Sequence, residues 1–439
     1  MRRVTIWSTD PVGERMAGPG IRYHRLSTEL ARSFAVTLVA PGAGVPNVPY
    51  DFRPTASVRR ATDVPGDVVV AQNLPLGLAR GLHRSGVRLV FDLYAPALVE
   101  AAAELSVNAP DHPVSRYEEV VAMTRVALLL GDAFLCASER QRDHWLGALA
   151  ALGRVTPAAY ATDPALRSLV AVVPFGLDPA APGARRKTVK GVVPGIESTD
   201  RLLLWGGGIW NWLDPLTVIR AVGRLAERRD DVRLLFLGMT HPSAAVGPMS
   251  MADQAVEVAS ELGLEGRTVF FNRTWVPFAE RSDWFAEADL GVSAHRDSVE
   301  ARLAFRTRLL DHIAAATPLV TTRGDVLADL AESRGFGRVV EPGDVDGWVG
   351  AVAALLDDEA HAAARTAARA VQGELAWSRA AEPLAELIER VAASQPRQVS
   401  TSPVLLRAAM TLARSSLERR GVRATVAAAA RTVSGGSRR

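Results

Sequence analysis

The feature that most restricts the fold of this chain is a regular alternation of short β-branched runs with longer helical segments. In segment 18–34 the apolar residues Ile21, Leu26 and Leu30 recur at roughly helical spacing. Short apolar strands that alternate with helices are typical of a parallel sheet covered by helices. In the first half of the chain the strand-like runs are residues 4–8, 36–40, 67–73, 88–94, 133–138 and 169–176.

The alternation breaks once and then begins again. Residues 174–198 are rich in Pro, Gly and charged residues and follow neither period, which is typical of a domain boundary. The second series has strand-like runs at 201–208, 232–238, 268–272, 290–295, 319–322 and 338–342, and helical segments at 214–229, 251–264, 282–289 and 325–334. We therefore predict an α/β protein with two consecutive doubly wound, Rossmann-like domains, and a ligand cleft between them.

The predicted boundaries follow from these patterns. An N-terminal domain covers residues 1–178, a linker 179–198, and a C-terminal domain 199–375. A closing helix covers residues 376–395, and a basic tail covers 396–439.

Composition indicates a soluble globular protein. The chain has 439 residues, of which 48% are hydrophobic and 23% charged. No apolar run reaches the roughly 18 to 20 residues of a membrane helix, and the start, MRRVTIWSTD, is expected to be a first strand and not a signal peptide. The single cysteine, Cys136, lies in the apolar run AFLCAS. It is expected to be a buried structural thiol in preference to a nucleophile, in a reducing cytoplasm.

Positive charge is concentrated in the tail. Residues 396–439 contain nine arginines and one acid, Glu418, a charge of +8; since the whole chain is +3, the remainder is −5. Lys187 and Lys190 are the only lysines, and both lie in the predicted linker. A cationic phosphate site in the body must therefore be built from arginines, backbone amides or helix ends.

Two glycine turns are candidate phosphate sites. Gly18, Gly20 and Arg22 follow the first strand and open a helix, where backbone amides and the helix dipole favour an anion. An ordinary strand–helix turn explains the same residues. In the equivalent place of the second domain, Gly207 and Gly208 precede Asn211. Their flanking tryptophans, Trp210 and Trp212, either face the ligand or belong to the core.

A charged segment, 295–325, holds the predicted catalytic residues. Glu300, Arg306, Arg308 and Asp311 lie between a strand and a helix. Arginine forks suit phosphates, and carboxylates suit sugar hydroxyls, so the segment predicts a sugar-nucleotide site. The alternative is a solvated helix face, which the interspersed apolar residues disfavour.

The loop after strand 268–272 supplies two further candidates. Arg273 and Trp275 are placed to hold a phosphate or cover a nucleobase, although a structural loop fits as well. Asp344 and Asp346 imitate a metal-binding DxD, but helix capping by Asp344 explains them better. No zinc spacing or Walker motif occurs, and we predict no metal and no cofactor.

Three motifs carry a resemblance to a known family over roughly residues 1–390. They are the glycine loop at Gly18 and Gly20, the VPFGLD turn at 173–178, and LLDHIAAATP at 309–318. In their order and spacing they resemble the GT-B glycosyltransferases of the retaining family-4 (group 1) type. The segments CASERQRDHWLGAL and WGGGIWNWLDPLTVIRA resemble an actinobacterial branch of that family. The resemblance implies that Glu300 meets the transferred sugar, Asp311 the ribose, and the Gly20 region the donor phosphates.

The sequence departs from that family in two places. The family has Glu-x7-Glu, whereas ten residues separate Glu300 from Asp311 and position 303 is Leu. The Arg/Lys pair that follows the second glycine turn in the family is replaced by WNWLD. We therefore expect Arg306 and Arg308, with Arg273, to hold the diphosphate.

The predicted function is metal-independent transfer of a sugar from a nucleoside diphosphate to an acceptor, with retention. The acceptor is a lipid-linked glycan or a small metabolite, and no nucleic acid is expected. Alternatives are a sugar-nucleotide epimerase or hydrolase and a non-catalytic sugar-nucleotide-binding partner protein.

The tail contains one predicted helical face. Leu405, Ala409, Leu412 and Ala413 are expected to share it, opposite Arg407 and Arg414. Such a helix suits peripheral contact with an anionic membrane, and a solvated tail is the alternative.

Overall fold

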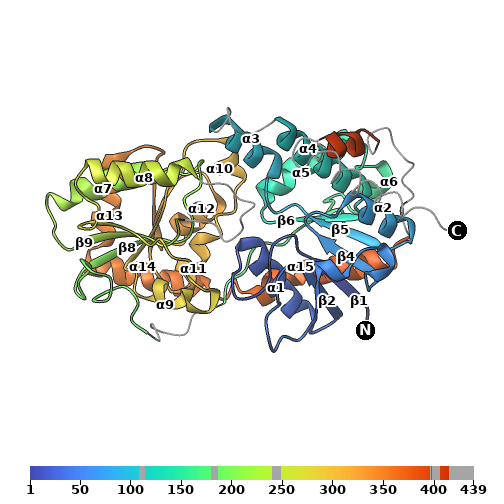
Figure 1. Ribbon diagram of the computed structural model, residues 1–439, viewed down its shortest axis with the longest axis horizontal. Helices are drawn as coiled ribbons and strands as arrows, with labels where there is room; N and C mark the ends of the chain where they lie inside the picture. The colour runs from blue at the N-terminus through green and yellow to red at the C-terminus, as the bar shows by residue number, and fades with distance from the viewer. Residues whose placement is uncertain (108–113, 179–185, 240–248, 396, 398–405, 415–439) are drawn as a thin grey trace. The chain divides into compact units, whose positions relative to one another are not determined.

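The computed structural model describes residues 1–107, 114–178, 186–239, 249–395, 397 and 406–414. The chain divides into two compact units, Met1–Pro174 with Ala380–Arg439 and Phe175–Arg379. Each unit contains one all-parallel sheet flanked by helices (Figure 1). The predicted α/β class with two doubly wound domains is confirmed.

The first unit has a seven-stranded sheet in the order β3-β2-β1-β4-β5-β6-β7. Its strands are β1 (Arg3–Trp7), β2 (Ala35–Ala40), β3 (Asp51–Pro54), β4 (Val68–Ala71), β5 (Arg88–Asp92), β6 (Ala133–Cys136) and β7 (Val170–Val172). Its helices are α1 (Gly18–Leu30), α2 (Leu76–Arg84), α3 (Ala97–Val107), α4 (Val114–Leu130), α5 (Glu139–Ala151), α6 (Pro157–Thr162) and most of α15 (Trp377–Ala393). Cys136 is buried in this unit's core, as predicted.

Arginines hold helix ends in the first unit. Arg154 and Arg397 both donate to the carbonyl of Gly131, just after α4. Arg88 donates to the carbonyls of Val391 and Ser394 at the end of α15. The carboxyl end of a helix carries unpaired carbonyls and partial negative charge, so a guanidinium there satisfies acceptors and stabilises the dipole.

The second unit has a six-stranded sheet in the order β10-β9-β8-β11-β12-β13. The strands are β8 (Arg201–Trp205), β9 (Val232–Phe236), β10 (Val269–Phe271), β11 (Leu290–Ser293), β12 (Leu319–Thr322) and β13 (Gly337–Val340). The helices are α7 (Pro215–Ala226), α8 (Ser250–Glu261), α9 (Arg281–Ala286), α10 (Val299–Leu303), α11 (Arg308–Ala314), α12 (Val326–Ser333), α13 (Val345–Leu355) and α14 (Asp358–Val371).

Both faces of this second sheet are covered. Helices α7, α8 and α13 pack together on one face, and α9, α11 and α14 on the other (Figure 1). Successive residues of a strand point to opposite faces. Leu203 and Trp205 of β8 accordingly enter the core beneath α7, whereas Leu202 and Leu204 enter the core that contains Phe285. The second unit is thus doubly wound around β8.

Part of the predicted linker belongs to the second unit. The carboxylate of Glu287 accepts hydrogen bonds from the backbone amides of Thr188, Val189 and Lys190. The ammonium of Lys190 lies 2.6 Å from the carboxylate of Asp289. Val189 is a core residue of the same unit, so this stretch is a packed extension of the second sheet.

The tail helix differs from its predicted orientation. Residues 406–414 are helical. Ala408 is buried and Leu412 packs against the core of the first unit, whereas Leu406 and Met410 are 66% and 57% exposed. Of the predicted face, Leu412 packs against the core, Ala409 is half-buried and Ala413 is exposed. Leu405 lies outside the described residues.

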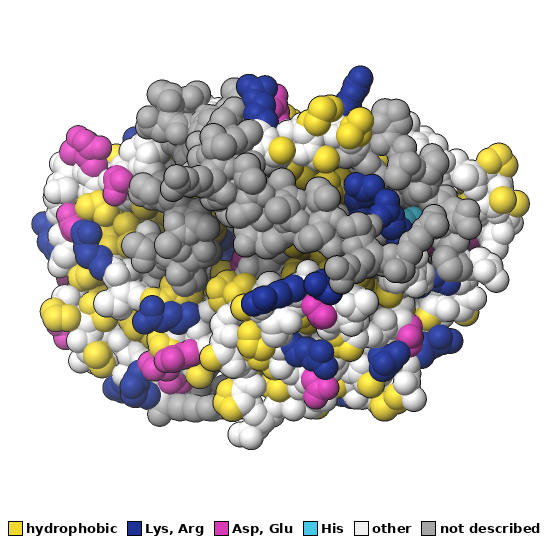
Figure 2. All heavy atoms as spheres, turned by 45° about the vertical axis from the view of Figure 1, so that its right-hand side comes forward, with side chains coloured by type: hydrophobic (Ala, Val, Ile, Leu, Met, Phe, Trp, Pro, Cys, Tyr) yellow, Lys and Arg dark blue, Asp and Glu magenta, His cyan; other side chains and the backbone are white. Residues whose placement is uncertain are grey.

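Over the described residues no helix is both long enough and apolar enough to cross a bilayer. Acidic and basic side chains are interspersed on the visible part of the face in Figure 2.

Candidate functional site

The site in the second unit lies where the sheet changes its direction of winding. From β8 the chain proceeds outward through β9 to β10 and then returns to β11, on the other side of β8. In open parallel sheets, ligands bind outside the carboxyl ends of the two strands that flank such a switch point. The residues that follow β8 and β11 are therefore the first candidates.

A glycine turn, Gly206–Gly208, follows β8. A Cβ on Gly206 would lie 2.6 Å from the ring of Phe285, so packing requires glycine there. Gly207 has φ +115°, which L side chains rarely adopt, and among the described residues no heavy atom lies within 4 Å of where its Cβ would be. Within the described part of the chain, the side of the turn toward which that Cβ would point is thus open.

The loop beyond the turn crosses toward β11. Asp214 donates its backbone amide to the carbonyl of Ala294 at 3.0 Å, and Leu213 pairs with His295. The rings of Trp210 and Trp212 stack with centroids 5.2 Å apart and planes 10° apart. Both are partly buried against the core, so the tryptophans combine core packing with partial exposure.

Asn211, predicted to bind the donor, makes structural hydrogen bonds through its amide oxygen. Its side chain is fully buried, and its amide oxygen accepts from the backbone amide of Met251 at 3.1 Å. It also accepts from the hydroxyl of Ser250 at 3.3 Å. Asn211 therefore satisfies the first turn of α8, whose own N-cap residue, Met249, makes no side-chain cap.

Arg308 connects the glycine turn to α11. Its guanidinium donates to the carbonyl of Gly208 at 2.8 Å and lies 5.5 Å from the ring centroid of Trp205. Burial, and then the charge of Arg306, lowers the pKa of Arg308 to about 9, so it remains cationic at pH 7. A positive charge therefore stands beside the open turn.

Arg306 is already paired. Its guanidinium donates to the carboxylate of Glu300 at 2.7 Å, and both side chains are buried. We predicted Arg306 for the diphosphate and Glu300 for the sugar. The structure joins them in one ion pair, so the positive charge of Arg306 is balanced without a phosphate.

Asp311 lies in the first turn of α11 and pairs with Arg281 at the start of α9. Burial raises the pKa of Asp311, the charge of Arg281 opposes that rise, and Asp178 adds to it. The Asp311 side chain is 37% exposed. Its position leaves a carboxylate within reach of a ligand at the carboxyl edge of the sheet.

Arg273 and Trp275 lie farther along the same edge. They follow β10, the edge strand, which is two strands from β8. Arg273 is 66% exposed with Glu265 at 3.5 Å, so it stands apart from Arg306 and Arg308. The indole nitrogen of Trp275 is buried and has no hydrogen-bond partner in the described part of the chain.

Two residues predicted for a phosphate site in the first unit, Arg22 and Gly20, have structural contacts within that unit. Arg22 has no exposed surface and donates to both carboxylate oxygens of Asp92, at 2.6 and 3.2 Å, and to the carbonyls of Val173 and Pro174. These bonds occupy its guanidinium in joining α1, β5 and the segment after β7. A Cβ on Gly20 would lie 2.4 Å from the carbonyl oxygen of Pro11, so close backbone packing explains that glycine. Gly18 is the first residue of α1.

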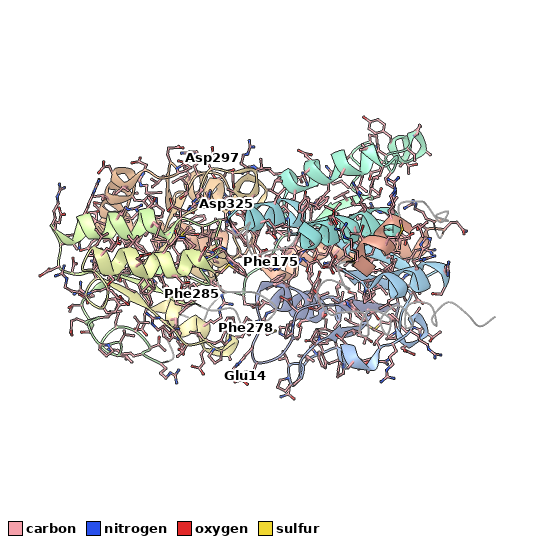
Figure 3. The ribbon with its side chains drawn as sticks, turned by 45° about the horizontal axis from the view of Figure 1, so that its top comes forward. Glu14, Phe175, Phe278, Phe285, Asp297 and Asp325 are labelled. Carbon is pink, nitrogen blue, oxygen red and sulfur yellow. The ribbon has the colours of Figure 1, made fainter. Side chains whose placement is uncertain are left out.

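Sequence reasoning missed two buried residues beside the site. His295 follows β11, and Asp325 caps α12 after β12 (Figure 3 labels Asp325). The available indication was an ionisable residue within three positions of the end of each buried strand. Asp344 caps α13, as predicted, by accepting from the backbone amide of Gly347 at 2.8 Å. Within the described residues no group of three or more His, Cys, Asp or Glu side chains could hold a metal.

Comparison with known proteins now defines the class of fold. WaaG, a glycosyltransferase involved in lipopolysaccharide biosynthesis, is 18% identical with a TM-score of 0.60, over 88% of this chain and 99% of WaaG. HepE from Anabaena in complex with UDP-glucose is 13% identical with a TM-score of 0.61, over 89% of this chain and all of HepE. A UDP-forming trehalose-phosphate synthase from Burkholderia xenovorans is 14% identical with a TM-score of 0.62, over 90% of this chain and all of the synthase. The fold is that of the GT-B glycosyltransferases.

The second unit carries a more specific likeness. Residues 200–358 match the family model described as Glycosyl transferases group 1. The matched region contains the switch point, the glycine turn, Arg308 and Asp311. The likeness to this family therefore covers the part of the second unit that holds the candidate site. A search of curated proteins returns no match.

Proposed function

We propose that the protein transfers a sugar from a nucleoside diphosphate to an acceptor with retention of the anomeric configuration. The observation that carries the proposal is the open turn at Gly207 with the cationic Arg308 fixed beside it, inside the region that matches the group 1 family. Backbone amides and a guanidinium together form an anion site.

The chemical role of this site follows from where charge develops. When the sugar leaves, negative charge grows on the diphosphate and positive charge on the sugar ring. Arg308 and the amides of the turn stabilise the leaving diphosphate electrostatically. Asp311 accepts hydrogen bonds from ribose hydroxyls, and Trp275 lies farther out, toward the nucleobase. We propose that arginine and amides replace a metal ion in this task.

The base of the donor is proposed from relatives. HepE has been crystallised with UDP-glucose, which makes a uridine donor the first to test. The acceptor is proposed to be a lipid-linked glycan or a small metabolite.

The test uses the full chain with UDP-, GDP-, ADP- and dTDP-sugars in the presence of EDTA. Thermal shift reports binding, nucleotide release reports turnover, and the anomeric coupling in the proton spectrum of the product reports stereochemistry. We expect one base to stabilise the protein, with binding lost in Asp311→Ala and kept in Asp253→Ala, an exposed acid on α8. Donor consumption without an acceptor would favour an epimerase or hydrolase, and binding without any turnover a non-catalytic partner. No shift with any donor would overturn the proposal.

We also propose that the tail contacts an anionic membrane surface. Leu406 and Met410 are exposed beside Arg407, and the tail carries +8. In the full chain, Leu406→Gln with Met410→Gln should reduce sedimentation with vesicles of 30% phosphatidylserine. Equal sedimentation of the wild type with anionic and neutral vesicles would contradict this contact.

A further inference from the structure

Four buried polar side chains converge beyond the carboxyl ends of β11 and β12. We call them the polar cluster: His295 follows β11, Glu300 lies on α10, Arg306 lies between α10 and α11, and Asp325, which Figure 3 labels, caps α12. None is more than 8% exposed. All four belong to the second unit, next to the proposed donor site.

The hydrogen bonds within the polar cluster determine which donor and acceptor atoms of each side chain are already used. Arg306 donates to one oxygen of Glu300, and one oxygen of Asp325 accepts from the amides of Leu327 and Ala328. Nδ1 of His295 lies 3.1 Å from the carbonyl oxygen of Arg296. Since that oxygen only accepts, Nδ1 carries the proton, and Nε2 of a neutral ring is an acceptor.

The remaining atoms are unsatisfied. Among the described residues, Nε2 of His295, Oδ2 of Asp325, Oε1 of Glu300 and Nε of Arg306 have no hydrogen-bond partner. Nε2 of His295 and Oδ2 of Asp325 lie 3.9 Å apart. Each of these two acceptors therefore calls for a donor that the described residues do not supply, because buried acceptors without partners are costly.

The chemistry of the polar cluster selects among ligands. Burial lowers the pKa of His295 to about 4, so the ring is neutral at pH 7. Two carboxylates against one guanidinium leave the cluster negative, which repels a phosphate. Three acceptors and one donor complement hydroxyl groups, each of which donates one proton and also accepts.

We propose that the polar cluster recognises hydroxyls of the sugar that is transferred, and that His295 and Asp325 are specificity-determining residues. This inference rests on the proposed function. One sugar hydroxyl donates to Oδ2 of Asp325 or Nε2 of His295, and a neighbouring hydroxyl bonds to Glu300 and Arg306. Because these atoms are buried, the proposal requires α10, the five-residue helix that carries Glu300, to move outward when the sugar binds.

This assignment divides the site into two parts. Arg306 serves the sugar, with its charge balanced by Glu300, and Arg308 serves the diphosphate. A change in the polar cluster should therefore alter affinity for the sugar part of the donor and leave affinity for the free nucleoside diphosphate unchanged.

Asp325→Asn is the sharpest test. Asparagine keeps the oxygen that caps α12 and replaces Oδ2 with an NH2 group that donates to His295. Asp329→Asn is the matched control, since Asp329 is exposed in the first turn of the same helix. His295→Phe is a second variant that keeps the ring and removes both nitrogens. Calorimetry measures binding of UDP against UDP-glucose, and of GDP against GDP-mannose.

We expect Asp325→Asn and His295→Phe to weaken binding of the sugar nucleotide at least tenfold while free nucleotide binds as in the wild type. With a series of deoxy-sugar donors, the variant and wild type should differ least for the donor that lacks the recognised hydroxyl. Equal effects on nucleotide and sugar nucleotide, or no effect on either, would overturn the inference and leave the polar cluster a structural one. If the wild type binds no nucleotide, the proposed function fails first, and this inference falls with it.

Discussion

The guanidinium of Arg308 donates a 2.8 Å hydrogen bond to the carbonyl of Gly208. This bond ties the start of α11, which carries Asp311, to the turn that follows β8. The two sides of the switch point are therefore held in a fixed register before any ligand binds. Such preorganisation is what an electrostatic catalyst needs, because no reorganisation then accompanies the reaction.

Arg308→Ala should lower kcat/KM at least about 100-fold, since it removes a charged donor to the leaving group. The kcat/KM of Arg308→Lys should lie between that of Arg308→Ala and that of the wild type, because lysine keeps the charge and loses the planar array of donors. Steady-state kinetics checks both. Arg220→Ala, on the exposed side of α7, is the control, and an equal loss there would remove the argument for Arg308.

Removing one partner of the buried Arg22–Asp92 pair should unfold the protein readily. Arg22→Met leaves the carboxylate of Asp92 buried without a counter-charge, at a cost of about 3 to 5 kcal/mol. The double variant Arg22→Met with Asp92→Leu should be more stable than Arg22→Met alone. Urea unfolding monitored by circular dichroism measures the difference, and strict additivity would contradict the coupling.

Gly291→Ala should destabilise the second unit. A Cβ there would lie 2.4 Å from Cγ of His312, and overpacking of this kind costs about 1 to 3 kcal/mol. Combining it with His312→Ala should recover part of that loss, because the space then exists. A double-mutant cycle on unfolding free energies measures the recovery, and its absence would mean that the strain lies elsewhere.

Acid should destabilise the protein through buried histidines. Burial lowers the pKa of His24 and His295 to about 4 and that of His312 to about 3. As the pH falls, the unfolded chain takes up these protons first, near pH 6.5. The contribution of the neutral buried histidines to the free energy of unfolding is therefore fully present above that pH and decreases below it. At pH 5 each histidine costs roughly 2 kcal/mol. Burial raises the pKa of Asp325 to about 6, so this carboxyl takes up its proton first in the folded protein. At pH 5 that uptake offsets roughly 1 kcal/mol of the stability lost through the histidines.

The measurement is the urea midpoint at pH 7.5 and at pH 5. His312→Asn, whatever its stability at pH 7.5, should lose less between the two values than the wild type does. An identical loss would show that His312 does not titrate across this range on unfolding.

Most strands were predictable because buried parallel strands are continuous apolar runs. β3 was not, since Asp51–Pro54 is polar, largely exposed and paired only with β2 at the sheet edge. An edge strand needs no buried face, so its sequence carries little pattern.

The site was predictable in its position but not in its pairings. The positions of the glycine turn and of Arg308 could be predicted because the apolar runs in the sequence show where the preceding strands end. The partners of Arg22 and Asn211, namely Asp92 and the first turn of α8, are distant in sequence. Periodicity locates a residue on an element, but only the assembled sheet decides which other element it meets.

The two lysines give the protein an unusual chemical handle. Lys187 is exposed, and Lys190 is partly buried against Asp289 in the stretch held by Glu287. Among the side chains of this sequence, an amine-directed dye would therefore attach mainly at Lys187, next to the stretch that packs in the second unit. Because every other cationic side chain of the Lys/Arg type is arginine, one dye can report on the second unit with no engineered labelling residue.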